Sequence, residues 1–319
     1  MTTLTQNIGI EYNISAENPN TPRTPLPAKR KKRFKDRPDG RYIRTLHAMN
    51  KFMPFIMPDR NDALNQFADE FDITETENFC RQMVASGRVN FSILHVILAA
   101  YIRTVSQRPA LNRFVNGQRI YARNDITVVM TIKKAMTADS PDTCIKVHFA
   151  PDDTVYDVYD KFNAVVEENK KNADLDSDFD KTANTLANLP RPILRGTVRL
   201  LNWLDYHGKL PKALVEVSPF HGGMIITSMG SLGIKPIYHH IYNFGNLPLF
   251  ISYGKKEMDA HVSRGGVGDT YRKIDIKVVT DERICDGFHY AAAFKILKKY
   301  VERPGILLDR PEVVVEDIE

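Results

Sequence analysis

The stretch that decides the fold occupies residues 281–289 and reads Asp281-Glu282-Arg283-Ile284-Cys285-Asp286-Gly287-Phe288-His289. It follows residues 274–280, where apolar and polar side chains alternate as they do in a half-buried strand. It precedes residues 288–300, which have the spacing of an amphipathic helix that ends before Pro304. The nine residues therefore connect a strand to the last helix, and Asp286 lies where that helix begins.

Two other segments combine glycine or proline with an apolar strand. Residues 222–230 read GGMIITSMG, a glycine pair followed by a short strand that ends near Ser228. Residues 106–114 read SQRPALNRF and join the end of an apolar helix, residues 89–105, to the start of a strand. An Asn-Gly turn at residues 116–117 predicts a pair of short strands around it.

The body of the chain alternates between strand and helix patterns. Residues 126–133, 143–149 and 248–254 are rich in β-branched or aromatic side chains and predict strands. Residues 154–169 and 191–206 have the periodicity of amphipathic helices. No internal repeat is visible. An α/β sandwich is the architecture that this order favours.

Residues 281–289 resemble the active-site segment of the chloramphenicol acetyltransferase and dihydrolipoamide acyltransferase superfamily, which has the pattern His-x-x-x-Asp-Gly. Residues 222–230 resemble the strand that supplies the oxyanion-stabilising Ser or Thr of that superfamily, and residues 106–114 resemble its proline turn. The resemblance covers about residues 41–308. It implies a two-layer α/β (α+β) sandwich, with a mixed sheet and helices on one face.

The resemblance also implies a chemistry, from which the sequence departs at one position. In the superfamily, the first motif residue is a His that removes a proton from a thiol, either coenzyme A (CoA) or dihydrolipoamide. Here that position holds Glu282. A thiol titrates near about 8.5 and a Glu near about 4.3, so Glu282 can serve as the base only where burial raises its pKa.

Further site residues follow from the same resemblance. Asp286 corresponds to the Asp that pairs with an Arg, and Arg44 is the candidate Arg. Ser228 corresponds to the oxyanion donor. Each has a plain structural alternative: Asp286 suits a helix N-terminus, and Ser228 is an ordinary strand hydroxyl. His289 is not expected to replace the missing base, because it lies three residues past Asp286 on the first helical turn, where the acetyltransferases carry a His in addition to the catalytic one. The histidines that could enter the site are His221, His239 and His240.

The charge of the chain is concentrated at one end. The net charge of +5 arises from 44 Lys and Arg against 39 Asp and Glu. Residues 1–46 contain ten of the basic residues and four acidic ones, so the rest of the chain is close to neutral. We therefore expect residues 1–40 to be a disordered basic tail, 41–310 the catalytic domain and 311–319 an acidic C-terminal tail. Nothing here indicates a specific nucleic-acid ligand.

Two basic segments leave alternatives open. The cluster from Lys29 to Lys35 is either a solvated linker or a weak contact for an anionic surface. The helix predicted at residues 191–206 places Arg191, Arg195 and Arg199 four residues apart and carries the only Trp, Trp203. A helix of this kind packs on its own domain or lies on a membrane surface.

The remaining expectations concern compartment and metal. The three cysteines, Cys80, Cys144 and Cys285, have no metal-type spacing and form an odd number, which favours free thiols in a reducing compartment. No signal peptide and no apolar run of about 20 residues is visible. We expect a cytoplasmic protein that holds no metal.

Two functions fit these observations. One is thioester acyl transfer to or from CoA or a dihydrolipoyl thiol, with altered or lost chemistry, in a homotrimer whose site forms between subunits. Its partner would be an acyl-thioester substrate or an acyl carrier. The other is a non-catalytic trimeric scaffold that binds CoA, pantetheine or a partner protein. Retention of Ser228 and Asp286 favours the first, and the change at Glu282 favours the second.

Overall fold

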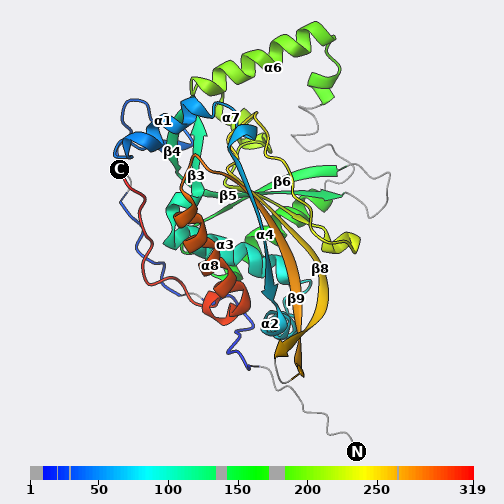
Figure 1. The fold of residues 1–319 in the computed structure, drawn as a ribbon. Helices are drawn as coiled ribbons and strands as arrows, with labels where there is room; N and C mark the ends of the chain where they lie inside the picture. The colour runs from blue at the N-terminus through cyan, green and yellow to red at the C-terminus, as the bar shows by residue number, and fades with distance from the viewer. Residues whose placement is uncertain (1–9, 20, 29, 134–141, 172–183, 264–265) are drawn as a thin grey trace, which may run out of the picture.

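The computed structural model describes residues 10–19, 21–28, 30–133, 142–171, 184–263 and 266–319. Helices and strands alternate along these residues, as the sequence pattern predicts (Figure 1). The strands are β1 (Gly40–Tyr42), β2 (Leu64–Asp72), β3 (Arg113–Asn116), β4 (Arg119–Arg123), β5 (Ile126–Lys133), β6 (Asp142–Phe149), β7 (Met224–Ser228), β8 (Leu249–Ser263) and β9 (Gly266–Asp281). The α-helices are α1 (Ala48–Ile56), α2 (Thr74–Ala85), α3 (Ile93–Gln107), α4 (Val155–Lys171), α6 (Arg191–Tyr206), α7 (Lys212–Val217) and α8 (Gly287–Glu302).

The larger of two sheets is mixed and has the strand order β2-β9-β8-β7-β5-β6. Strands β5, β7 and β8 run parallel, and β2 with β9, β8 with β9, and β5 with β6 are antiparallel pairs. The register places Ser228 opposite Tyr253 and Tyr253 opposite Ile276. The smaller sheet pairs β1, β4 and β3, and its β3–β4 turn is the predicted Asn-Gly hairpin, with Gly117 at a φ of 52°.

Helices α2, α3, α4 and α8 cover one face of the large sheet, and the main core lies between them and the strands (Figure 1). Helix α3 forms the centre of this layer because nearly all its side chains are apolar and buried. A smaller apolar cluster lies on the other face, where Ile241 and Leu247 of the irregular segment 229–248 pack on Ile225, Phe250 and Val279. The predicted sandwich with helices on one face is confirmed.

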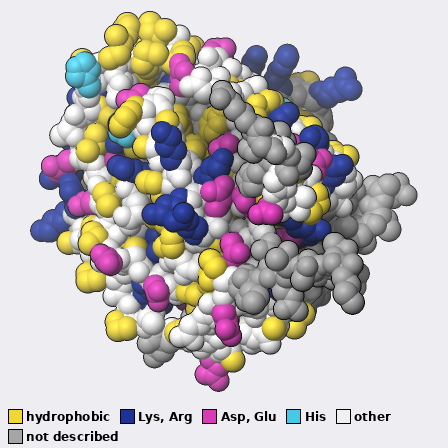
Figure 2. All heavy atoms as spheres, turned by 60° about the horizontal axis from the view of Figure 1, so that its bottom comes forward, with side chains coloured by type: hydrophobic (Ala, Val, Ile, Leu, Met, Phe, Trp, Pro, Cys, Tyr) yellow, Lys and Arg dark blue, Asp and Glu magenta, His cyan; other side chains and the backbone are white. Residues whose placement is uncertain are grey.

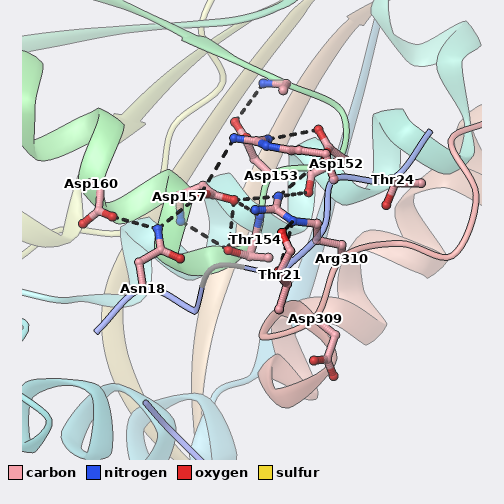
Figure 3. Close-up of polar contacts among 12 residues, drawn as sticks. Asn18, Thr21, Thr24, Asp152, Asp153, Thr154, Asp157, Asp160, Asp309 and Arg310 are labelled. Carbon is pink, nitrogen blue, oxygen red and sulfur yellow. Dashed lines mark hydrogen bonds and ion pairs between the residues drawn. The ribbon is translucent and has the colours of Figure 1, made fainter. Parts of the chain in front are cut away.

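The N-terminal segment differs from the predicted disordered tail. Its described residues have little regular structure, but residues 10–18 lie along α2 and the start of α4, where hydrogen bonds hold them. Figure 3 shows Asn18, Thr21 and Thr24 beside residues 152–160. Arg23 contacts the carboxylates of Asp152 and Asp153 at 3.1 and 2.8 Å. Thr24 is buried and donates to the carbonyl of Pro311 at 2.6 Å. Composition predicted disorder because the contacts that order this segment come from residues far away in the chain.

The predicted tail at residues 311–319 also packs against the body. Asp317 pairs with Arg113 at 2.5 Å, and both side chains are buried. Glu319 contacts Arg30 at 3.1 Å and Arg33 at 2.5 Å. The basic cluster of the N-terminal segment therefore lies partly against the acidic C-terminal segment. On the face that Figure 2 turns toward the viewer, positive and negative side chains are interspersed.

Helix α6 has the predicted bounds but does not pack on the body along its length. It extends away from the rest of the chain (Figure 1), and Asp205 is its one buried residue. The helix is attached at its C-terminal end, where Tyr206 donates its hydroxyl proton to Gln118 at 2.7 Å. Trp203 is 51% exposed. Packing on its own domain is thus the wrong alternative, and contact with a membrane surface stays a prediction.

Candidate active site

A buried ionic network holds the C-terminal end of β9. The carboxylate of Asp281 accepts from Arg283 at 2.8 and 2.7 Å and from Arg60 at 3.3 Å. Arg283 also donates to the carbonyl of Met57 at 2.9 Å, and Tyr290 donates to the carbonyl of Asp281 at 2.7 Å. Burial lowers the pKa of Arg60, although Asp281 opposes this shift. These contacts fix the direction in which the chain leaves the sheet.

Glu282 is the next residue after this network. Its N–H donates to the carbonyl of Ala63 at 2.9 Å, which fixes the backbone. Its side chain is partly exposed and makes no hydrogen bond or ion pair with the part of the chain that the structure describes. Within one chain, the carboxylate is therefore neither paired nor fully buried.

Asp286 is the N-cap of α8 and forms a close pair with His289. The same carboxylate oxygen accepts from the N–H of His289 at 2.9 Å and from its imidazole Nδ1 at 2.8 Å. The bond from the His289 N–H is the main reason why the pKa of Asp286 is lowered. The imidazole Nε2 has no partner among the described residues, and Phe288 beside the pair is 81% exposed. The pair resembles the carboxylate–imidazole half of a catalytic triad.

Cys285 cannot serve as a nucleophile at neutral pH. Its side chain is buried, and burial raises the pKa of the thiol to about 12. A thiol with such a pKa is almost entirely protonated near pH 7. The polar side chains of this segment that reach the surface are the carboxylates of Glu282 and Asp286 and the imidazole of His289.

Ser228 lies at the end of β7, where it is partly exposed. A hydrogen bond joins its side chain to that of the buried Tyr253; burial raises the pKa of Tyr253, and this bond opposes the rise. The glycine pair before β7 has a structural reason at Gly223, because a Cβ there would lie 2.5 Å from Oδ1 of Asn112 and 2.9 Å from the backbone carbonyl oxygen of Thr127 in β5. The strand can thus approach β5 closely enough to pair with it.

Ser228 and Glu282 lie at opposite ends of the sheet. The register aligns Ser228 with Ile276 across β8, and Glu282 lies six residues further along the chain. At about 3.3 Å per residue, the two are separated by about 20 Å along the strands. One chain therefore does not bring the predicted base and the predicted oxyanion donor together.

Arg44 does not contact Asp286 in this chain. Its guanidinium donates to the carbonyls of Phe34 and Tyr42, at 2.7 and 3.0 Å, and lies 3.4 Å from the carboxylate of Asp36. The predicted pairing of Arg44 with Asp286 is thus wrong within one chain. Asp36 takes this place because it lies only eight residues before Arg44, on the same loop.

The other histidines occupy separate places. His221 is buried between Asp205 at 3.2 Å and Ser218 at 2.8 Å. His239 stacks on Phe250 with ring centroids 4.3 Å apart, and His240 lies against Tyr242. Sequence reasoning named these residues as candidates but could not place them. The Asp286–His289 pair had a signal in the sequence, because an Asp N-cap and a His three residues later lie on the same helical turn.

Comparison with known proteins identifies similar solved structures but no protein of similar sequence. No family model matches the chain, and no curated protein matches it in sequence. A solved structure of a probable dihydrolipoamide acetyltransferase from Listeria monocytogenes 4b F2365 matches with a TM-score of 0.51 at 14% identity, over 82% of this chain and 94% of that one. The Azotobacter vinelandii dihydrolipoamide acetyltransferase (E2p) matches with a TM-score of 0.52 at 16% identity, over 89% and 99%.

The chain has the dihydrolipoamide acetyltransferase fold. The resemblance inferred from residues 106–114, 222–230 and 281–289 is thereby confirmed at the level of the fold. In the Azotobacter vinelandii enzyme, a serine, a histidine and an asparagine have been investigated for their role in the catalytic mechanism. A chloramphenicol acetyltransferase also matches, with a TM-score of 0.48 at 13% identity, over 79% of this chain and 94% of that one.

Two further observations concern membranes and metals. Over the residues that the structure describes, no helix has both the length and the apolar character needed to cross a bilayer. Within those same residues, no group of three or more His, Cys, Asp or Glu side chains is arranged to hold a metal ion.

Proposed function

We propose that the protein catalyses thioester acyl transfer to or from CoA or a related thiol, at a site that forms between two copies of the chain within a homotrimer. The observation that carries this proposal is the separation of Ser228 from the Asp286–His289 pair, at the two ends of one sheet. A second copy would place its Ser228 beside the first copy's residues 282–289. Closed cyclic assemblies repeat such a contact at every interface.

The exposed groups around residues 282–289 support a site shared between copies. Phe288 is 81% exposed, and the side chains of Asp286 and His289 are 63% and 52% exposed. An exposed aromatic side chain beside a charged pair is typical of a surface that a partner covers. On burial, the pair would lose water and its electrostatic interactions would strengthen.

The chemical step follows from the roles available. Nε2 of His289, oriented through Nδ1 by Asp286, would take the proton from the acceptor thiol. The thiolate would attack the acyl carbonyl carbon, and the hydroxyl of Ser228 from a second copy would donate to the resulting oxyanion. The carbon–sulfur bond of the donor thioester would then break, and its thiolate would take the proton back from His289.

Glu282 is the competing base, and the two assignments make different predictions. The spacing of four residues between Glu282 and Asp286 is that between the histidine and the asparagine investigated in the Azotobacter vinelandii enzyme. A carboxylate at this position needs a dry environment to accept a proton from a thiol. In one chain Glu282 is partly exposed, whereas His289 already has its orienting carboxylate.

The test is transfer of the acyl group from acetyl-CoA and longer acyl-CoAs to dihydrolipoamide, followed by chromatography as release of CoA and formation of acyl-dihydrolipoamide. We expect His289→Gln to lower kcat/KM by about 10²–10⁴-fold, the usual value of general-base assistance. Glu282→Gln should change it much less. If the order is reversed, Glu282 is the base, and if neither variant changes turnover, the release does not come from this site.

The alternative function is a non-catalytic binding protein for CoA, pantetheine or a partner protein. The presence of Glu282 at the position of the superfamily's His favours it. In that case the wild-type protein would transfer no acyl group, whereas Glu282→His would gain the activity. A thermal shift with CoA or pantetheine in both proteins shows whether the ligand binds.

A further inference from the structure

A cavity of about 230 Å³ lies at the edge of the large sheet, on the side of β5 and β6. The turn between β4 and β5, helix α7 and the loop before β1 enclose it. Strands β7 and β8 separate this edge from β9, so the cavity is distinct from residues 282–289. Its charged lining includes Arg37, Asp39, Arg123, Asp125, Lys146 and Glu216.

The acidic side chains of the cavity already have cationic partners. Asp39 pairs with Arg37 at 2.9 Å. Asp125 and Glu216 contact the two ring nitrogens of His148, at 2.9 and 2.6 Å. The hydrogen bond that Asp125 accepts is the main reason why the pKa of His148 is raised. These pairs largely neutralise one another.

Arg123 has no carboxylate partner of its own among the residues that the structure describes. Its Nη2 donates to the carbonyl and the side-chain oxygen of Asn246, at 3.1 and 3.0 Å, and its guanidinium lies over the ring of Phe114 at 4.4 Å. Its Nε is buried and has no hydrogen-bond partner within that part of the chain. Asp39 contacts the amide of Asn246, and the charges of Asp39 and Asp125 act on the guanidinium without forming an ion pair with it. The Nε has no accessible surface, so a ligand in the cavity would meet the Nη end of the guanidinium.

Lys146 is a further cation of the cavity that forms no ion pair within the described residues, although the charge of Glu216 acts on it. Its Nζ donates to the carbonyl of Val215 at 2.7 Å, and no carboxylate among the described residues lies within ion-pair distance. Burial lowers its pKa to about 8. An ammonium group has three protons, so it can still donate to a ligand in the cavity. Arg123 and Lys146 thus line one small space, and neither forms an ion pair within the described residues.

We propose that this cavity binds a compact anion bearing a carboxylate or a phosphate group, held by Arg123 and Lys146. A guanidinium that forms no ion pair matches the oxygens of either group, and an ammonium adds a point charge. The volume is below the range of about 300–1,000 Å³ that is usual for drug-sized ligands, which limits the ligand to a small molecule. The proposal does not depend on the acyl-transfer function.

Acetylation of lysines by an N-hydroxysuccinimide ester, followed residue by residue with mass spectrometry, tests the site in the full-length protein. Inorganic phosphate and succinate are the two probes, each compared with chloride at equal ionic strength. At ten times the Kd, labelling of Lys146 should slow about tenfold, because the site is then about nine-tenths occupied. Lys295, which is exposed on α8, is the internal reference and should not change.

The two probes distinguish a phosphate from a carboxylate ligand by their relative protection of Lys146. In Arg123→Gln, protection should be lost while the labelling of Lys295 stays the same. Should that variant fail to fold, Lys146→Gln provides a second test, because its thermal stabilisation by the protecting anion should vanish. The proposal is overturned if neither anion protects Lys146 at about 50 mM, well above the Kd of even a weak specific site, or if Arg123→Gln is protected equally.

Discussion

The guanidinium of Arg37 contacts the carboxylate of Asp205 at 2.7 Å, and both side chains are buried. Arg37 also donates to the backbone carbonyl of Asp205 at 2.6 Å, and Asn116 donates to the second carboxylate oxygen at 2.8 Å. The pair ties the loop before β1 to the last turn of α6. Since α6 extends away from the body elsewhere, this tie fixes where the helix leaves the domain.

Asp205→Asn should lower the free energy of unfolding by about 3 kcal/mol, because it leaves Arg37 buried beside a neutral side chain. This loss of unfolding free energy is at the low end of the range for broken buried ion pairs, because Asp39 still pairs with Arg37 in the variant. Urea denaturation measures it. The matched control is Glu167→Gln, which removes the charge from an exposed pair with Lys170 and should change stability by less than about 0.5 kcal/mol. Equal effects would contradict a buried role for Asp205.

The same carboxylate predicts a pH dependence. Burial acts to raise the pKa of Asp205, but the hydrogen bond from His221 and the charge of Arg37 outweigh it and lower the pKa to about 2. Because the folded pKa is below the unfolded value, the stabilisation is present above about pH 4 and is lost as the pH falls toward about 2. The difference in unfolding free energy between wild type and Asp205→Asn should therefore shrink between about pH 5 and about pH 2. A constant difference would argue against the low pKa.

The contacts drawn in Figure 3 predict that Arg310 contributes more to the stability of the fold than Arg23 does. Arg310 is nearly buried and contacts Asp157 at 2.9 Å and the carbonyl of Asp152 at 2.9 Å, whereas the side chain of Arg23 is 51% exposed. Arg310→Ala should cost about 2–4 kcal/mol, because it leaves buried acceptors unpaired. Arg23→Ala should cost about 1 kcal/mol or less. Guanidinium denaturation of the two variants compares them, and a larger loss for Arg23→Ala would contradict this ranking.

Two glycine-to-alanine substitutions should change stability in opposite directions. One glycine lies in a closely packed place, and the other lies in a helix with free space around it. In Gly223→Ala the new Cβ would lie 2.5 Å from Oδ1 of Asn112, so β7 must shift and stability should fall by about 1–3 kcal/mol. Gly196 lies in α6, where a Cβ would meet no described atom within 4 Å, so Gly196→Ala should raise stability by about 0.5–1 kcal/mol. Thermal unfolding followed by circular dichroism gives both signs. A stabilising Gly223→Ala would show that β7 does not approach β5 this closely.

A site shared between copies predicts complementation. Ser228→Ala and His289→Gln should each be inactive alone, because each removes one half of every site. After mixing, unfolding and joint refolding of equal amounts, about a quarter of the sites would combine two intact halves. The rate of acyl transfer from acyl-CoA to dihydrolipoamide, measured by chromatography as CoA formed, should then return to about a quarter of the wild-type rate per site. No recovery, although the mixed oligomer forms, would mean that both residues act within one chain.

The sequence predicted the elements that depend on local patterns. The strand before residue 281, the helix after Asp286, the Asn-Gly hairpin and helix α6 all occur where periodicity and turn residues place them. Strand β2 has no such local pattern, because Leu64–Asp72 is a mostly polar edge strand without alternation. Its pairing with β9 supplies the order that its own sequence does not indicate.

The site could be predicted less well than the fold, because it depends on distant contacts. Motif order suggested that Ser228 and Glu282 belong to one reaction, but only the strand register shows that they lie at opposite ends of the sheet. The pairing of Arg44 with Asp36 and the ordering of the segment around Arg23 likewise depend on partners that no local pattern identifies. The cavity at Lys146 joins four parts of the chain and has no sequence signature.

The distance between the two ends of the sheet has a consequence for how activity would respond to dilution. A chain that carries two incomplete halves contributes nothing by itself, so the rate per molecule would depend on protein concentration around the dissociation constant of the assembly. Below that concentration the protein would have little activity. Above it, each added subunit would complete the site of a neighbouring subunit. Gene dosage would then set a threshold and not a proportional output.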